Sequence, residues 1–236
     1  MESGLRYLEI IYQFFLDGLF PKFCLSCGRE KTWFCQDCLA LYKPVPCFSS
    51  CFFCEKKDTL GETCEKCQKH VFLDGCLSFG FYGDPILRKT LQKWKYHGQR
   101  SFEVFLNRWI QTSSLIPQLL PVDWFLQPIP LHRKKEYERG FNQAKVIAQM
   151  ISNRTNFPIA HVLTRNIWTN AQAGRKGSVR CLGELDDIFA LKVKSIPSHI
   201  LLCDDVFTSG ATMDAAAKVL KEAGAEMVWG IVLAKG

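Results

Sequence analysis

One stretch near the end of the chain, from His199 to Thr212, constrains the fold and the chemistry more than any other. The short apolar run Ile200 to Cys203 predicts a buried strand of a parallel sheet. Asp204 and Asp205 follow, and a loop of small residues then leads into a helix that opens at Ala211. The N–H groups at the start of such a helix favour a phosphate, and the two acids suit the hydroxyls of a sugar. The stretch therefore predicts a site for a ribose 5-phosphate group. The alternative is an ordinary strand-to-helix turn in a doubly wound α/β protein.

The same residues resemble a known motif. Apolar residues, two acids and the pattern T-[ST]-G-x-T look like the 5-phosphoribosyl-1-pyrophosphate (PRPP) motif of type I phosphoribosyltransferases. By that resemblance, Asp204 and Asp205 bind the ribose 2′ and 3′ hydroxyls. The 5′-phosphate is then held by the loop residues Thr208, Ser209, Gly210, Ala211 and Thr212.

The cysteines are concentrated in one part of the chain. Of 12 cysteines in 236 residues, ten lie between Cys24 and Cys76, which indicates either a disulfide framework or metal binding. Residues 1–20 mix charged residues with apolar ones at helical spacing, so they predict an amphipathic packing helix rather than a secretory signal. No apolar run is long enough to span a bilayer. We therefore expect a cytoplasmic protein whose cysteines bind metal.

Eight of these cysteines form four Cys-x2-Cys pairs, a spacing that lets two sulfurs reach one ion from a tight turn. Two pairs complete a tetrahedral site, so the sequence predicts two structural zinc ions, with no open position for catalysis. We expect the pairs to combine in sequence order; an interleaved arrangement is the alternative. Cys47 and Cys76 are left over, and we expect both to be buried as small apolar residues. The predicted ligands are Cys24, Cys27, Cys35, Cys38, Cys51, Cys54, Cys64 and Cys67.

Basic and aromatic residues are interleaved in this module, and the formal net charge of +7 suits a polyanionic ligand. Such a mixture binds single-stranded nucleic acid through charge and base stacking. The alternative is that most of the aromatic residues pack around the metal-binding turns. The residues concerned are Lys22, Arg29, Lys31, Lys56, Lys57, Lys66 and Lys69, with Trp33, Phe34, Tyr42, Phe48, Phe52 and Phe53.

Strands alternate with helices in the rest of the chain, which predicts an α/β fold. Further strands are expected at residues 77–82, 122–127, 159–163, 188–191 and 227–233, and helices from Pro85 and from Ala144. This alternation predicts a mostly parallel twisted sheet flanked by helices, with a ligand site at the carboxyl ends of its strands. We expect three parts: an N-terminal helix (1–20), a double zinc-binding module (21–76) and a type I phosphoribosyltransferase-like domain (77–236).

A basic cluster follows the expected strand 122–127. Arg133, Lys134 and Arg139 would lie near the phosphate loop, and the pyrophosphate of PRPP requires such a second basic loop. Taken alone, these charges are also typical of a solvated helix face.

The residues around this cluster resemble a family signature. Pro128-Ile129-Pro130-Leu131-x-Arg133, followed by Arg139-Gly140-Phe141-Asn142-Gln143, looks like the signature of the ComF family of competence-associated phosphoribosyltransferase-like proteins. Lys95-Tyr96-x-Gly98 fits the same pattern, and that family also has an N-terminal cysteine-rich zinc module. The resemblance thus covers nearly the whole chain.

One region departs from the family pattern. Where the family has an arginine pair and then an asparagine, this chain has Arg180, Cys181 and Gly183. In phosphoribosyltransferases this region resembles a mobile loop that closes over the substrate. Arg165 and Arg175 are the basic residues expected to reach the ligand from this lid.

The resemblance implies a protein that binds PRPP and Mg²⁺ and acts in natural transformation after DNA uptake. Single-stranded DNA and helicase or recombination proteins are its implied partners. Mg²⁺ suits Asp204 and Asp205 because it takes few carboxylates beside phosphate oxygens and water. As a transferase, the chain would use Arg133, Lys134 and the lid to offset charge on the leaving pyrophosphate. No motif marks a general base or an acceptor. The alternative is an active phosphoribosyltransferase of nucleotide or purine salvage without a DNA role.

Overall fold

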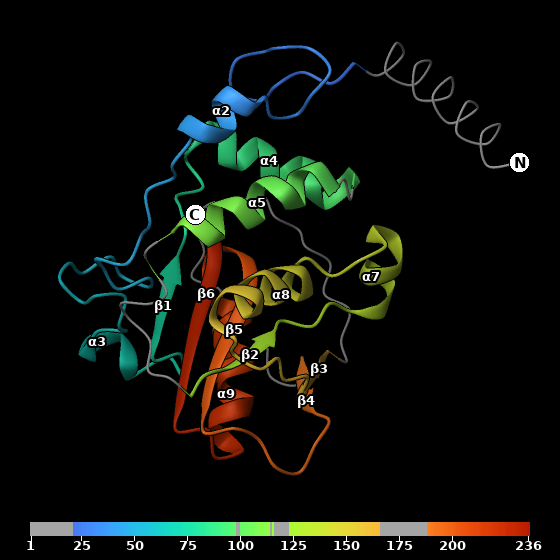
Figure 1. Ribbon diagram of the computed structural model, residues 1–236. Coiled ribbons are helices and arrows are strands. Elements are labelled where there is room, and N and C mark those ends of the chain that lie inside the picture. Colours follow the sequence, from blue (N-terminus) through green and yellow to red (C-terminus); the bar gives the residue numbers. More distant parts are fainter. Residues whose placement is uncertain (1–20, 98–99, 114, 116–122, 166–187) are drawn as a thin grey trace, which may run out of the picture.

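A parallel four-stranded sheet forms the centre of the molecule (Figure 1). The structure is a computed structural model that describes residues 21–97, 100–113, 115, 123–165 and 188–236. The strand order is β1 (Gly75–Ser78), β6 (Met227–Lys235), β5 (His199–Phe207) and β2 (Phe125–Pro128), and every neighbouring pair is parallel. The expected α/β fold with a mostly parallel sheet is confirmed.

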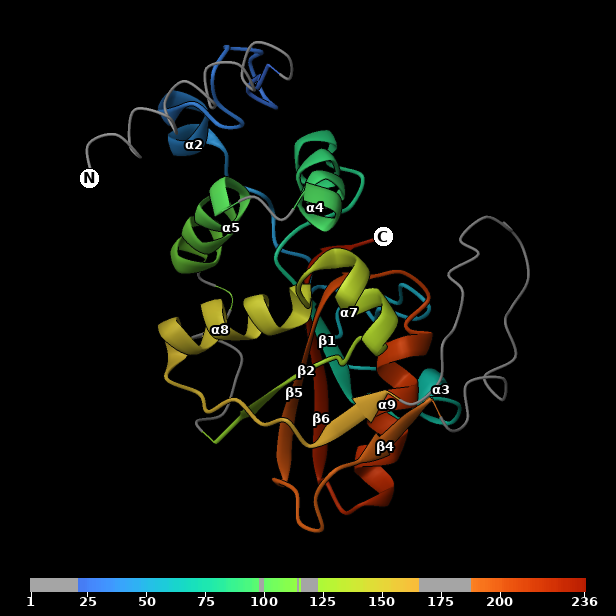
Figure 2. The ribbon, with the colours of Figure 1, turned by 90° about the vertical axis from the view of Figure 1, so that its right-hand side faces the viewer.

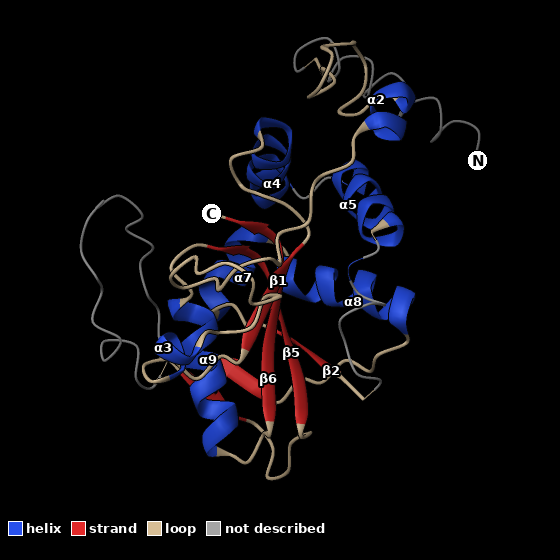
Figure 3. Cartoon of the chain, turned by 90° about the vertical axis from the view of Figure 1, so that its left-hand side faces the viewer, coloured by secondary structure: helices blue, strands red, loops and turns tan. Residues whose placement is uncertain are grey.

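Helices cover both faces of this sheet (Figure 3). The four longer ones are α4 (Pro85–His97), α5 (Arg100–Thr112), α8 (Gln143–Thr155) and α9 (Ala211–Glu222). Leu201 and Cys203 of β5 join the core formed with α4, α5 and α8, while Ile200 and Leu202 join the core formed with α9. Because the first half of β5 is buried on both faces, its residues Ile200 to Cys203 are continuously apolar rather than alternating.

Two expected strands do not join the main sheet. β3 (Leu163–Arg165) and β4 (Phe189–Leu191) pair with each other as a separate antiparallel ribbon. The chain before β3 follows β2 through a single bridge between Ile159 and Leu126. The apolar residues of the ribbon, Leu163 and Phe189, are buried in the core on the α9 side. The ribbon therefore lies beside the sheet, packed on the same core as α9.

The cysteine module consists of two turns with the same local layout. In each, the first cysteine is buried, the second is exposed, and the third precedes a short helix: α2 (Gln36–Leu41) or α3 (Glu65–Gln68). We call residues 23–41 the first knuckle and residues 50–68 the second knuckle. The first lies over α4 and α5, and the second lies beside β1 (Figure 1).

The segment around the second knuckle hydrogen-bonds to the free edge of β1. The Cys76 amide donates to the Gly61 carbonyl at 2.8 Å, and the Ser78 amide donates to the Cys47 carbonyl at 3.0 Å. The boundary expected at residue 76 thus falls inside a strand of the main sheet. The cysteine module covers an edge that would otherwise be open to pairing with another chain.

The aromatic residues of the module pack against protein. Phe34 stacks on Phe105 of α5 with ring centroids 3.9 Å apart, and Trp33 lies 5.5 Å from Phe102. Tyr42, Phe48, Phe52 and Phe53 are likewise half-buried or buried in the two cores. The packing of these six side chains in the structure agrees with the packing alternative.

Further predictions concern the two cysteines outside the Cys-x2-Cys pairs, membrane-spanning segments and residues at the N-terminus and in the lid. Cys76 is buried, as expected, whereas Cys47 is only partly buried. Within the described ranges, no helix is both long and apolar enough to cross a membrane. The expected N-terminal helix (1–20) and the lid residue Arg175 lie outside the described residues.

Candidate functional site

The loop between β5 and α9 lines a hollow at the carboxyl end of the sheet. Thr208 and Ser209 are exposed, Gly210 caps the helix in a left-handed conformation, and α9 begins at Ala211. The hollow is lined by Asp204, Val206, Phe207, Thr208, Ser209, Gly210, Ala211, Thr212 and Met213. All seven residues expected to bind PRPP belong to this segment, and Asp205 is the one among them that does not line the hollow.

Only glycine fits at position 210. Its φ is +79°, and a Cβ there would lie 2.4 Å from the Phe207 ring and 2.6 Å from the Phe53 ring. The backbone of the loop is therefore held against two aromatic rings, one from β5 and one from the second knuckle. This close approach fixes where the first N–H groups of α9 point.

The two acids are adjacent but have different surroundings. The Asp205 amide donates to Asp204 Oδ1 at 2.8 Å, and Asp205 Oδ2 forms an ion pair with Lys95 Nζ at 2.8 Å. Burial and then the Asp205 carboxylate raise the pKa of Asp204 to about 7. Lys95 and Arg165 act in the opposite direction. Burial and the neighbouring carboxylate therefore outweigh these two cations, so Asp204 ionises less readily than an exposed aspartate.

Lys95 is a site residue that sequence reasoning did not assign. It lies near the end of α4, far from Asp205 in the sequence, and its side chain is mostly buried. Its place in the Lys95-Tyr96-x-Gly98 pattern was a signal, but a pattern on a helix does not say which distant residue it contacts. The fold brings α4 over the carboxyl end of β5 and supplies that contact.

Further cations gather at the same end of the sheet. The helix α7 (Arg133–Arg139) follows β2, the parallel neighbour of β5, so it lies at the end of the sheet where α9 begins (Figure 2). Burial, and then the charges of Arg165 and Arg139, lower the pKa of Lys135. Both arginines are therefore close enough to Lys135 to repel its charge. Arg133 and Lys134 are exposed on α7.

The turn between α7 and α8 fixes the position of this basic helix. Gly140 ends α7 with φ +76°, and the buried Asn142 caps α8 by accepting from the Ala144 amide at 2.9 Å. The Asn142 side chain also donates to the Ile129 carbonyl at the end of β2. Arg139 donates to Gln143 Oε1 at 3.2 Å. The signature residues 139–143 thus build the turn rather than line the hollow.

Arg165 comes from the antiparallel ribbon. Its guanidinium lies over the Phe189 ring, 5.6 Å from the centroid. Burial lowers its pKa, and the charge of Asp204 opposes that shift. The structure thus brings Arg165 toward Asp204.

The two cysteine groups have the geometry of tetrahedral metal sites. The sulfurs of Cys24, Cys27, Cys35 and Cys38, and those of Cys51, Cys54, Cys64 and Cys67, lie within 4.8 Å of one another in each group. Cys27 and Cys35 Sγ are 3.6 Å apart, and Cys54 and Cys64 Sγ are 3.5 Å apart. Four sulfurs at about 2.3 Å from a zinc ion are separated by roughly 3.8 Å. Each group can therefore hold one zinc ion, and the pairs combine in sequence order.

Backbone N–H donors favour the thiolate form at Cys24 in the first group and at Cys64 in the second. Burial raises the pKa of Cys24, but backbone N–H groups outweigh it and lower the value to about 6. The backbone N–H of Cys67 is the main cause that lowers the pKa of Cys64 to about 7. Because zinc binds the thiolate form, these donors suit the metal.

Comparison with known proteins gives relatives along most of the chain, although no family model matches it. Competence protein ComFC of Bacillus subtilis (strain 168) is 27% identical over 231 residues, which cover 88% of this chain and 92% of the relative. Competence protein F of Haemophilus influenzae is 27% identical over 227 residues (89% and 96%). Competence protein ComFC of Streptococcus pneumoniae is 27% identical over 226 residues (87% and 96%). The chain is therefore similar to these three competence proteins along most of its length, as its motifs predict.

Proposed function

We propose that this chain binds PRPP together with Mg²⁺ in the hollow between β5 and α9 and acts in natural competence. The names of its relatives support the role in competence. The observation that supports the ligand is a glycine-containing loop at a helix start that lies next to two acids, Asp204 and the Lys95-paired Asp205. A phosphate group suits the loop, and sugar hydroxyls suit the acids.

Each part of the ligand has a proposed place. The loop 208–212 holds the 5′-phosphate, and Asp204 and Asp205 accept hydrogen bonds from the ribose hydroxyls. A bound Mg²⁺ would offset the charge of the acids and of the pyrophosphate. The cations of α7 and Arg165 face the pyrophosphate, where positive charge opposes the charge that builds up if it leaves.

The test is calorimetric titration of the protein with PRPP in the presence of Mg²⁺. Wild type should bind, and Asp204→Asn and Asp205→Asn should each weaken binding at least tenfold. Asp123→Asn, which changes an exposed acid elsewhere, should leave the affinity unchanged. Absence of binding by the wild type would refute the proposal.

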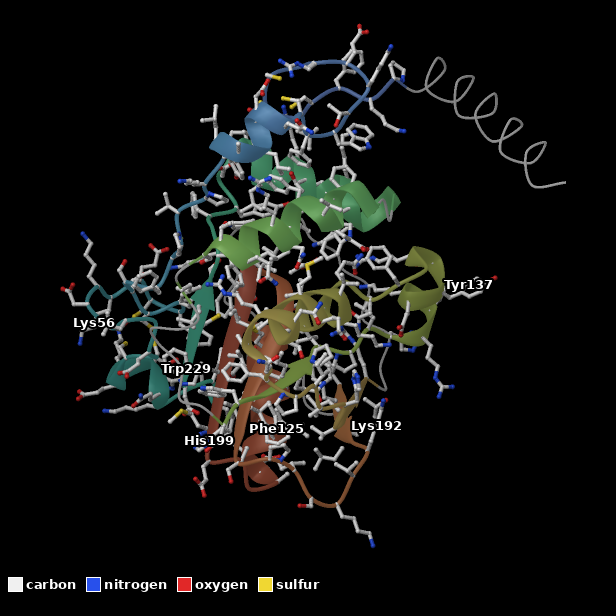
Figure 4. The ribbon with its side chains drawn as sticks, viewed as in Figure 1. Lys56, Phe125, Tyr137, Lys192, His199 and Trp229 are labelled. Atoms are coloured by element: carbon white, nitrogen blue, oxygen red, sulfur yellow. The ribbon has the colours of Figure 1, made fainter. Side chains whose placement is uncertain are left out.

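We also propose contact with single-stranded DNA, supported by exposed cations rather than by aromatic residues of the knuckles. Lys31, Lys56, Lys57, Lys66 and Lys69 are exposed. Lys56 projects outward from the second knuckle, and Tyr137 projects from α7 (Figure 4). Tyr137 is 90% exposed and offers a surface on which a base can stack.

Salt-dependent binding of a fluorescent oligothymidine tests this contact. Joint Lys56→Gln and Lys57→Gln substitution should reduce both the affinity and its dependence on salt. Tyr137→Ala should reduce the affinity with the salt dependence unchanged, because stacking releases no counterions. Helicase or recombination proteins remain proposed partners. Release of pyrophosphate with a free nucleobase would instead favour the salvage reaction.

A further inference from the structure

The two knuckles share one layout but pack against different parts of the molecule. The first contacts α4 and α5 through Trp33 and Phe34, and Lys93 of α4 lies 4.3 Å from the centroid of the Trp33 ring. The second contacts the loop between β5 and α9. This difference suggests that the two metal sites serve different purposes.

The residues that touch the loop lie inside a metal-binding turn. Phe52 and Phe53 are the two residues between Cys51 and Cys54. Their ring centroids lie 5.2 Å and 5.5 Å from that of Phe207, and both pairs are edge-to-face. The Phe53 ring also lies against the backbone of Gly210, since a Cβ there would come within 2.6 Å of it.

Polar contacts join Glu55 of the second knuckle, and residues 72–74 just after it, to the end of β6 and to α9. Asp214, in the first turn of α9, accepts from the Phe72 amide at 2.6 Å and from the Leu73 amide at 3.1 Å. Asp74 forms an ion pair with Lys221 at 2.7 Å. Lys235, beside Phe207 in the sheet, reaches Glu55 at 3.6 Å. The second knuckle and the residues 72–74 that follow it thus hold α9 and the end of β6 next to the loop.

A segment this short has no apolar core of its own, so metal binding determines its order. We propose that metal in the second four-cysteine group sets the geometry of the β5–α9 loop, through Phe52 and Phe53, and thereby the affinity for the sugar phosphate. The first four-cysteine group has no such effect. Phe52 and Phe53 are positioning residues in this scheme. The effect on affinity rests on the proposed PRPP site; the effect on the loop does not.

Two cysteines at equivalent positions provide the test. Cys54 and Cys27 are the exposed second ligands of their groups. Cys54→Ser and Cys27→Ser should each lose about one zinc ion per chain by elemental analysis. Cys54→Ser should weaken binding of PRPP with Mg²⁺ at least tenfold, and Cys27→Ser less than twofold. If the two variants lose the same amount of PRPP affinity, the proposal is wrong.

A third variant keeps every ligand. Phe53→Leu should retain two zinc ions and the wild-type melting temperature within a few degrees, yet weaken PRPP binding several-fold. If its affinity equals that of wild type, Phe53 does not position the loop and the proposal fails.

Hydrogen exchange separates this proposal from the proposed function. The amides of residues 208–213 should exchange faster in Cys54→Ser and in Phe53→Leu, but not in Cys27→Ser, even without ligand. Wild type that fails to bind PRPP would refute the proposed function alone. Unchanged exchange at the loop would refute the coupling, whatever the ligand.

Discussion

At the scale of single residues, the candidate site depends on whether the Asp204 carboxyl is ionised. Burial and Asp205 raise the pKa of Asp204 to about 7. A raised pKa means that this group favours folding below about pH 4 and that its contribution is lost as the pH rises through 7. Mg²⁺ and ribose hydroxyls require the ionised carboxylate.

Affinity for PRPP with Mg²⁺ should therefore rise with pH until Asp204 is ionised. Below pH 7 we expect a fall of up to about tenfold per pH unit. Calorimetry from pH 5.5 to 8.5 measures the profile. The phosphates of the ligand also titrate, and the pH profile of Asp204→Asn measures their contribution alone. If the affinity of this variant has the same pH profile as that of wild type, Asp204 does not cause the pH dependence.

Lys95 should shift this profile. Lys95→Met removes the cation that pairs with Asp205 at 2.8 Å and that lowers the pKa of Asp204. The midpoint of the binding profile should move above pH 7, and the free energy of unfolding should fall by about 1–3 kcal/mol because a mostly buried carboxylate loses its partner. Urea unfolding measures the second effect. Lys89→Met, at an exposed position of the same helix, should change neither.

The sequence predicts the acids and Arg165 as site residues, but it does not predict Lys95 or which cation lies near which acid, for a physical reason. Asp204 and Asp205 stand next to the strand and loop that explain them, so a local pattern is enough. Lys95 and Arg165 reach the same site from α4 and from the β3–β4 ribbon, and only the tertiary fold decides that contact.

At the scale of elements, the loop between β5 and α9 depends on Gly210 both for its backbone conformation and for its close packing. Gly210 has a left-handed φ and lies against Phe207 and Phe53, whereas Gly224, at the other end of α9, has φ +99° and open space around it. Gly224→Ala should cost about 1 kcal/mol from backbone strain. Gly210→Ala should cost more, because the methyl group meets two rings, and only this variant should lose PRPP binding. Equal costs in chemical unfolding would contradict the close packing.

Element types were easier to predict than their partners. The strand expected before Asp204 continues to Phe207, since β6 pairs with it as far as Phe207, whereas β2 pairs with it only as far as Cys203. The segments 159–163 and 188–191 were expected as further strands, but their short apolar runs do not specify a neighbour. The structure pairs β3 with β4 outside the main sheet. A pattern of period two identifies a strand and leaves its sheet undetermined.

At the scale of the whole molecule, the cysteine module and the sheet form one structure. The spacing of the cysteines was enough to predict the ligands, because it is local, whereas the structure decides between pairing in sequence order and the interleaved alternative. The aromatic residues between them could equally bind a ligand or pack, and the helices α4 and α5 that receive them are distant in the sequence. The module is thus a part of the fold, with one knuckle at the candidate site and its flanking segments on the edge of β1.

From this arrangement we expect the cover of the β1 edge to depend on metal. The amides of Cys76 and Ser78 point toward the module and donate to Gly61 and Cys47, whereas the Phe79 amide donates to Val232 of β6 at 3.0 Å. Removal of zinc with a chelator should speed exchange at Cys76 and Ser78 and leave Phe79 protected. The uncovered edge should then pair with other copies of the chain, so light scattering should rise and fall again when Zn²⁺ is restored before aggregation is complete. Faster exchange at all three amides would mean that the whole sheet unfolds, and no change would mean that the module keeps its place on β1 without metal.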